Sequence, residues 1–362
     1  MSIRSDFWKR MRGENTPQIP WFGDLSYYYF SLQQQGKLEP KYEGPEGEVR
    51  FYQDRKVGIC FYAPLTYRVA YTGGVTFEER TTAEGIFSTY HTRYGSLHSV
   101  QKYLPSTYSY AYTKHFVETL DDLRIMAHIF ENMRYEPSYE AFRERDALYG
   151  EDGLAVELAP ISVAPIQKLL ARWAGVAATV DLFAEDTDEF EECMRRIEEA
   201  QMPVFDVLAG SGAPLIEFPE NISSEVTGSF FDRYNLPYYQ RVTEILHRAG
   251  KTVSVHIDGM LKPCLGKLHT AGFDIAEAVT PAPVGDIAVK DLREYAGEDI
   301  FIWGGLPGAM FTSTFTDKQF ADHVQAILDL SDPKMILGVA DEVPPDAVDE
   351  RIREVSRLIG RG

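Results

Sequence analysis

Cysteine is scarce in this sequence of 362 residues, which contains only Cys60, Cys193 and Cys264. A small, odd number of cysteines fits free thiols in a reducing compartment rather than a disulfide framework. Long hydrophobic runs are also missing. No stretch of about 18 apolar residues could span a membrane, and the charged segment 1–12 lacks the apolar core of a signal peptide. We therefore expect a cytoplasmic protein with no membrane span.

Positive charge is in short supply, because 36 Lys and Arg residues face 55 Asp and Glu residues, for a formal net charge of −19. Nucleic acids and anionic membranes require a basic face, so we expect neither as a partner. A small anionic substrate is not excluded, since a local arginine cluster can override the overall field. The hydrophobic content of 44% is normal for a globular protein with a large core.

After Gly150, short apolar runs alternate with longer amphipathic segments. The apolar runs are 154–158, 214–218, 253–257, 275–279, 300–303 and 335–340, and the helical patterns lie near 165–173, 188–200, 230–249, 262–271, 289–295, 317–330 and 345–359. This alternation predicts βαβ units and a parallel sheet. The strand count approaches eight if the N-terminal half supplies one or two. We therefore predict an α/β fold, a (β/α)8 TIM barrel, as a single domain over residues 1–362.

The N-terminal half has a different texture. Helical patterns cover 5–11, 120–133 and 139–148, with Thr119 as a plausible N-cap. Residues 50–115 are rich in Tyr and Phe, in short runs separated by Gly and Pro, which predicts an antiparallel or loop-rich elaboration of the barrel. Its tyrosines could stack an aromatic substrate, or they could simply form core and interface packing.

The segment 253–259 combines two kinds of face in one predicted strand. Its odd-numbered positions from 253 to 257 are apolar, whereas Ser254, His256 and Asp258 point the other way. Such a strand suits a parallel barrel, where one face meets the helices and the other meets the barrel interior and mouth. Active sites of these barrels lie at the C-terminal ends of the strands.

Ionisable residues stand at or near the ends of several predicted strands: Glu217, His256 with Asp258, Glu277 and Asp341. A single residue of this kind is usually a cap, but several would converge on one barrel mouth. Their side chains suit Zn²⁺ or another divalent ion, or general acid–base catalysis. A metal would be held by His256 and Glu217, with Asp258 or Asp341 as third ligand. The alternative is a hydrogen-bonded polar network that fills the barrel.

Two further features, one in each half of the chain, are weaker indications of a functional site. Asp24 follows the extended segment 16–22, and it is either an acid at a strand end or a turn or cap residue before Leu25. The glycine-rich loop 303–308 lacks the lysine and the spacing of a P-loop, so no nucleotide cofactor is assigned to it.

Five segments carry a family resemblance: 217–224 (EFPENISS), 238–250 (YYQRVTEILHRAG), 256–259 (HIDG), 271–274 (AGFD) and 338–345 (GVADEVPP). Together they resemble the uroporphyrinogen decarboxylase superfamily, which also contains corrinoid-dependent, zinc-containing methyltransferases. The resemblance covers 205–361 well and 120–200 loosely. It implies a (β/α)8 barrel with its site at the strand C-termini, and a homodimer.

The sequence departs from both branches of that superfamily. The decarboxylases carry an arginine-rich N-terminal motif that grips the porphyrinogen carboxylates, but the segment 16–22 in its place has no arginine. The methyltransferases use His-x-Cys and a later cysteine around zinc, whereas here Asp258 replaces the first cysteine and 339–341 occupy the region of the second. A metal site of oxygen and nitrogen ligands is chemically harder than a thiolate site. It disfavours activation of a thiol coenzyme and permits a Lewis-acid role towards an ether, amine or alcohol.

The first hypothesis is therefore a methyltransferase-like enzyme that moves a methyl group between a small methylated substrate and a separate corrinoid protein. The chain itself has no Asp-x-His-x-x-Gly corrinoid motif. A second hypothesis is a metal-free decarboxylase of a small or porphyrinogen-like carboxylated substrate, in which Asp24 or Asp258 protonates or stabilises a developing charge. A third is a non-catalytic barrel whose mouth is filled by side chains.

Replacement of His256 tests the first hypothesis. We expect His256→Ala to abolish activity while the circular dichroism spectrum and cooperative unfolding stay those of the parent protein. Full activity in this variant would reject a functional role for His256.

Overall fold

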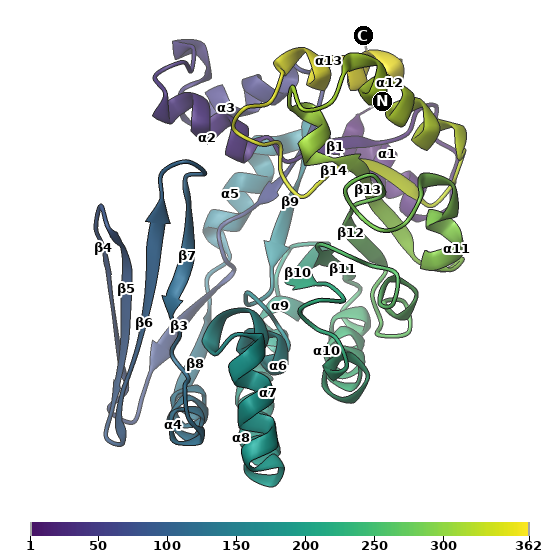
Figure 1. The fold of residues 1–362 in the computed structure, drawn as a ribbon. Coiled ribbons are helices and arrows are strands. Elements are labelled where there is room, and N and C mark those ends of the chain that lie inside the picture. The colour runs from purple at the N-terminus through teal and green to yellow at the C-terminus, as the bar shows by residue number, and fades with distance from the viewer. Residues whose placement is uncertain (1, 361–362) are drawn as a thin grey trace.

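The computed structural model describes residues 2–360 and contains a closed barrel of eight parallel strands. In chain order these are β1 (Trp21–Gly23), β2 (Gly58–Tyr62), β9 (Gly153–Leu158), β10 (Leu215–Ile222), β11 (Thr252–Ile257), β12 (Ile275–Val279), β13 (Phe301–Pro307) and β14 (Met335–Ala340). Strand β1 pairs with both β14 and β2 and so closes the ring. The predicted TIM barrel is confirmed (Figure 1), and the six predicted strands overlap β9 to β14.

Helices flank the barrel and the antiparallel elaboration beside it. In the C-terminal part they are α6 (Pro165–Lys168), α7 (Val176–Glu185), α8 (Thr187–Gln201), α9 (Pro203–Ala209), α10 (Leu236–Arg248), α11 (Leu292–Ala296), α12 (Asp317–Asp329) and α13 (Asp349–Leu358). The N-terminal part contributes α1 (Ile3–Met11), α2 (Ser26–Gln34), α3 (Gly44–Gln53), α4 (Leu120–Glu131) and α5 (Glu140–Tyr149). As predicted, Thr119 caps α4: its hydroxyl accepts a hydrogen bond from the backbone N–H of Asp122.

Helix α10 illustrates why these segments are helical. Proline occupies one of its first positions, where no backbone N–H is needed, and Gly250 lies past its end with φ +75°. Tyr239, Val242 and Leu246 follow the helical repeat and are buried against the barrel. The helix predicted over 262–271 was wrong, because the chain there forms only a 3₁₀ turn at Leu265–Lys267, in a segment interrupted by proline and glycine.

The first helix seals one end of the barrel. The ring of Phe7 in α1 lies edge-on to Phe22 of β1 and 5.4 Å from the ring centre of Trp303 of β13. Gly338 of β14 leaves room for Trp303, since a Cβ at this position would lie 2.7 Å from its indole ring. These aromatic rings fill the barrel floor, so the space inside the barrel opens at the C-terminal ends of the strands.

The antiparallel elaboration stands beside the barrel in Figure 1. Strand β3 (Tyr67–Tyr71) pairs with β8 (Met133–Pro137), and β4 (Thr76–Thr81), β5 (Gly85–Thr92), β6 (Gly95–Leu104) and β7 (Ser109–Lys114) form a second sheet. The range predicted for it, 50–115, also contains the end of α3 and the barrel strand β2. Strand β2 is rich in aromatic residues, like the segments next to it in the sequence, but it pairs with the barrel strands β1 and β9. None of the helices described in residues 2–360 is long and apolar enough to cross a membrane.

Removal of the aromatic floor should destabilise the barrel. We expect Phe7→Ala to lower the free energy of unfolding by about 3–5 kcal/mol, because it leaves a cavity beneath Phe22 and Trp303. Phe30→Ala, at an exposed ring, should cost about 0.5 kcal/mol. Urea denaturation of both variants measures the difference, and equal losses would contradict a sealing role for α1.

Candidate metal centre

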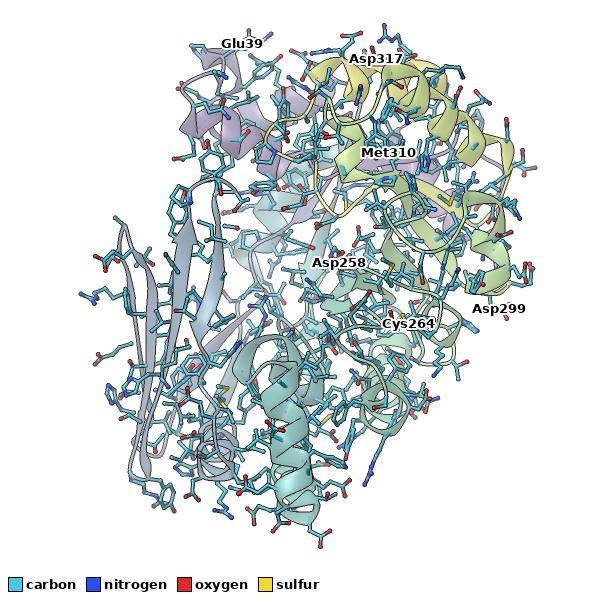
Figure 2. All side chains as sticks on the ribbon, in the orientation of Figure 1. Glu39, Asp258, Cys264, Asp299, Met310 and Asp317 are labelled. Atoms are coloured by element: carbon cyan, nitrogen blue, oxygen red, sulfur yellow. The ribbon has the colours of Figure 1, made fainter. Side chains whose placement is uncertain are left out.

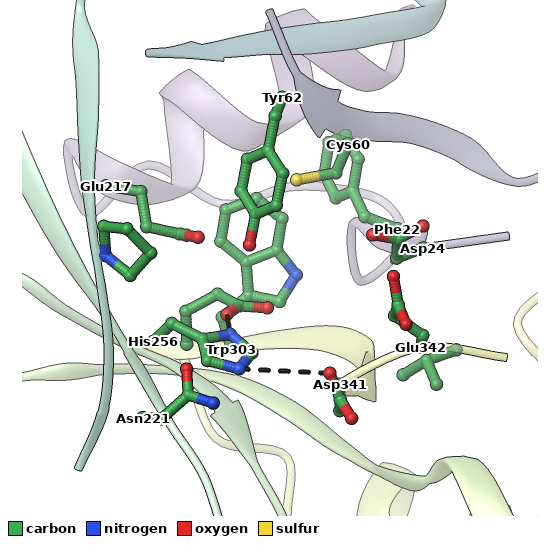
Figure 3. Close-up of a pocket in the computed structure, with 13 residues that line it drawn as sticks. Phe22, Asp24, Cys60, Tyr62, Glu217, Asn221, His256, Trp303, Asp341 and Glu342 are labelled. Atoms are coloured by element: carbon green, nitrogen blue, oxygen red, sulfur yellow. Dashed lines mark hydrogen bonds and ion pairs between the residues drawn. The ribbon is translucent and has the colours of Figure 1, made fainter. Parts of the chain in front are cut away.

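A cavity of about 220 Å³ lies inside the barrel at the C-terminal ends of the strands. Seven of the eight barrel strands contribute side chains to its walls, either directly or from the loop that follows. The lining residues are Phe22, Asp24, Cys60, Tyr62, Glu217, Pro219, Asn221, His256, Glu277, Trp303, Val339, Asp341 and Glu342 (Figure 3). No Lys or Arg occurs in this lining, as far as the described residues extend.

Three adjacent strands place a cluster of potential metal ligands in one wall of the cavity. Glu217 of β10, His256 of β11 and Glu277 of β12 each offer one ligand atom, and these atoms lie within 4.8 Å of one another. His256 and Glu277 are direct partners in the register of β11 and β12. Their side chains therefore emerge side by side, with His256 Nδ1 2.6 Å from Glu277 Oε2. We refer to these three residues as the Glu–His–Glu cluster.

The charges of the cluster are coupled through burial. Burial and the negative charge of Glu277 together raise the pKa of Glu217 to about 8, against the opposing effects of His256 and nearby hydroxyls. Burial disfavours the imidazolium of His256, but the neighbouring Glu277 carboxylate outweighs it and raises the pKa of His256 to about 10. Without a metal, the cluster therefore retains protons at neutral pH.

Glu217 has unused capacity to bind a ligand. It is only 2% exposed, and Ser254 Oγ donates a hydrogen bond to its Oε2 at 3.3 Å. The hydroxyl of Tyr62 lies beside the same carboxylate (Figure 3) and also favours its charged form. A carboxylate has about four acceptor sites, so Glu217 can bind a cation while it accepts from these hydroxyl groups, and a cation would stabilise its buried charge.

The facing wall of the cavity is also acidic. Asp24, Asp341 and Glu342 line it, and Asp341 Oδ1 lies 3.9 Å from His256 Nε2. Asp341 has φ +69°, a conformation that few residues other than glycine adopt, and Asn221 at the opposite rim has φ +51°. Such backbone strain is typical of functional sites, where it aims side chains that regular strands could not.

The sequence-predicted residues divide into three groups. Glu217 and His256 lie in the cluster, whereas Asp24 and Asp341 line the cavity outside it. Asp258 does not line this cavity: it is exposed in the loop after β11 (Figure 2), where its carboxylate accepts a hydrogen bond from the Gly259 N–H. Strand β11 ends at Ile257, so the alternation that would have directed Asp258 inward stops one residue too early.

Sequence reasoning missed several lining residues. Glu277 was recognised as an acid near a strand end but was not assigned as a ligand, and its register with His256 is what decides its place. Cys60 and Tyr62 were hidden in a segment that was interpreted as part of the elaboration. Burial raises the pKa of both side chains, so both are uncharged at neutral pH.

A family model described as Uroporphyrinogen decarboxylase (URO-D) matches residues 106–361, which is more than half of the chain. The chain belongs to the uroporphyrinogen decarboxylase family. This membership confirms the resemblance found in the sequence motifs. No curated protein sequence matches the chain.

One solved structure shows that the chain shares its fold with a methyltransferase. A methyltransferase from Methanosarcina mazei is similar with a TM-score of 0.60 and 14% sequence identity, over 99% of this chain and 98% of that chain. A B12-independent methionine synthase from Shewanella sp. W3-18-1, in complex with selenomethionine, has a TM-score of 0.42 and 12% identity over 90% and 89% of the two chains. At 14% identity, the likeness to the Methanosarcina mazei methyltransferase shows a shared fold.

The raised pKa of Glu217 predicts how stability depends on pH. Between about pH 5 and pH 8, Glu217 keeps its proton in the folded, metal-free protein but has lost it in the unfolded chain. The free energy of unfolding should therefore fall as the pH rises through this window. Glu217→Gln should make the decline shallower, whereas Glu298→Gln, at an exposed site, should not. Urea denaturation of chelator-treated protein at several pH values measures this, and parallel pH profiles for all three proteins would contradict the protonation of Glu217.

Proposed function

We propose that this protein is a metal-assisted methyltransferase that moves a methyl group between a small methylated substrate and a separate corrinoid protein. The observation that carries the proposal is the Glu–His–Glu cluster in the wall of a cavity at the barrel mouth. Family membership and the shared fold with a methyltransferase are consistent with it.

The cluster has the composition of a catalytic metal site. Imidazole nitrogens and carboxylate oxygens both serve as zinc ligands, and three protein ligands leave further coordination positions open. The cluster lines open space, and no Lys or Arg in the described lining competes for its carboxylates. When bound, the metal would supply Lewis-acid polarisation of the heteroatom that carries the methyl group.

The remaining lining residues would give the substrate site its shape and exclude water from it. Phe22, Tyr62 and Trp303 present aromatic rings to the cavity, and Val339 adds an apolar side chain. These groups would pack against the carbon atoms of a substrate and exclude water from the reacting atoms. The volume of about 220 Å³ suits a small substrate or one end of a larger one.

The charges of the cavity weigh against the decarboxylase alternative. A porphyrinogen-like substrate presents several carboxylates and needs cationic side chains to bind them. The described lining contains five carboxylic side chains and no Lys or Arg. The open volume also opposes the third hypothesis, in which side chains fill the mouth of a non-catalytic barrel.

Metal analysis tests the proposal directly. We expect about one divalent ion per chain after incubation with zinc and dialysis, and transfer of a methyl group to free cob(I)alamin as a surrogate acceptor. Glu277→Gln should weaken metal binding by more than about 100-fold and abolish transfer, because one ligand of the cluster is lost.

His269→Ala provides the matched control, since this histidine is exposed and outside the cavity. It should retain the metal and the activity of the parent protein. A wild-type protein that takes up no metal, or a Glu277→Gln variant with full metal content, would refute the proposal.

A further inference from the structure

Two carboxylic side chains lie together in the wall that faces the Glu–His–Glu cluster. Asp24 comes from the loop after β1 and Glu342 from the loop after β14, and these strands are neighbours in the barrel. Figure 3 shows both groups on the side of the cavity opposite Glu217. We refer to them as the Asp24–Glu342 pair.

Local hydrogen bonds hold the pair in place. The backbone N–H of Ser26 donates to Asp24 Oδ1 at 2.8 Å, and the hydroxyl of Ser26 donates to Glu342 Oε1 at 3.5 Å. The two loops are also joined through their backbones, because Val343 N–H donates to the Asp24 carbonyl oxygen at 2.9 Å. The pair is therefore a built feature of the cavity rather than two loosely tethered acids.

The electrostatic surroundings favour a proton on this pair. Burial and the negative charge of Glu342 raise the pKa of Asp24 to about 8, with a smaller contribution from Glu277. Asp341, next to Glu342 in the sequence, also lines the cavity and adds negative charge beside the pair. Asp24 and Glu342 are half-buried and approach the same serine, so they repel each other when both are ionised, which favours a proton on one of them.

Methyl transfer to a corrinoid creates a demand for such a proton. When the bond between the methyl carbon and its heteroatom breaks, the electron pair of that bond stays on the heteroatom. An alkoxide or amide left in this way is a strong base and a phenoxide is a weaker one, and a positioned acid lowers the barrier to departure of a basic leaving group by donating a proton.

We propose that the Asp24–Glu342 pair is the general acid that protonates the heteroatom as the methyl group leaves. The inference rests on the proposed function. The reduced corrinoid supplies the electron pair for the new cobalt–carbon bond, the heteroatom keeps the pair of the broken bond and takes the proton, and the acid pair recovers a proton from water. The cluster would hold the substrate from one wall while the acid acts from the other.

Infrared spectroscopy tests whether the pair holds a proton. At neutral pH we expect the carbonyl stretch of a protonated carboxylic acid that disappears in Asp24→Asn and changes in Glu342→Gln. Asparagine keeps an oxygen that can accept from Ser26, so this substitution preserves the loop. Asp188→Asn, at an exposed site on α8, should leave the band unchanged. If no band depends on Asp24 or Glu342, the inference is wrong.

A series of leaving groups tests whether the proton is used. Methyl aryl ethers from methoxyphenol to nitroanisole serve as probes, with free cob(I)alamin as acceptor and zinc-loaded protein as enzyme. Asp24→Asn should slow transfer about 100-fold or more from the poorest leaving group and little from nitroanisole, whose phenolate needs no proton. Asp188→Asn should follow the parent protein throughout.

The outcomes separate the two proposals. Zinc-loaded variants that lose activity equally for every ether, or not at all, would overturn the general-acid role and leave the methyltransferase proposal standing. A wild-type protein that binds no metal and transfers no methyl group would overturn the proposed function, and the general-acid role would fall with it.

Discussion

The contact between His256 and Glu277 is the interaction on which the site depends. The two side chains meet at 2.6 Å because β11 and β12 pair in a register that sets them directly opposite each other. A slip of one residue would turn one of them outward, towards the helices, and remove the cluster. The hydrophobic faces of the strands fix that register, so the packing of the barrel determines the geometry of its polar mouth.

An accumulation of acids within the barrel is tolerable only because most of the charge is suppressed or paired. His256 lies against Glu277, while Glu217, Asp24 and Glu342 have raised pKa values. No Lys or Arg of the described chain lines this cavity to neutralise them. A bound cation at one wall and a shared proton at the other would each relieve part of this repulsion, which links the two proposals to a single electrostatic cause.

Most of the barrel was predictable because the sequence pattern of each of its later strands lies within the strand and the segments that flank it. Each strand from β9 to β14 is a short apolar run between amphipathic segments, and ionisable residues at strand ends identified Glu217 and His256. Membership of β2 in the barrel depends on its pairing with strands far away in sequence, which its aromatic composition does not reveal. The side-chain alternation that places His256 inward predicts the same for Asp258, but it holds only while the strand continues.

The structure of the protein with its metal would test the central claim most directly. An anomalous diffraction map from crystals grown with zinc should show one strong peak between Glu217, His256 and Glu277, with ligand distances of about 2.0–2.2 Å. The absence of a peak in this cavity, or a zinc ion bound only by residues outside the cluster, would contradict the account.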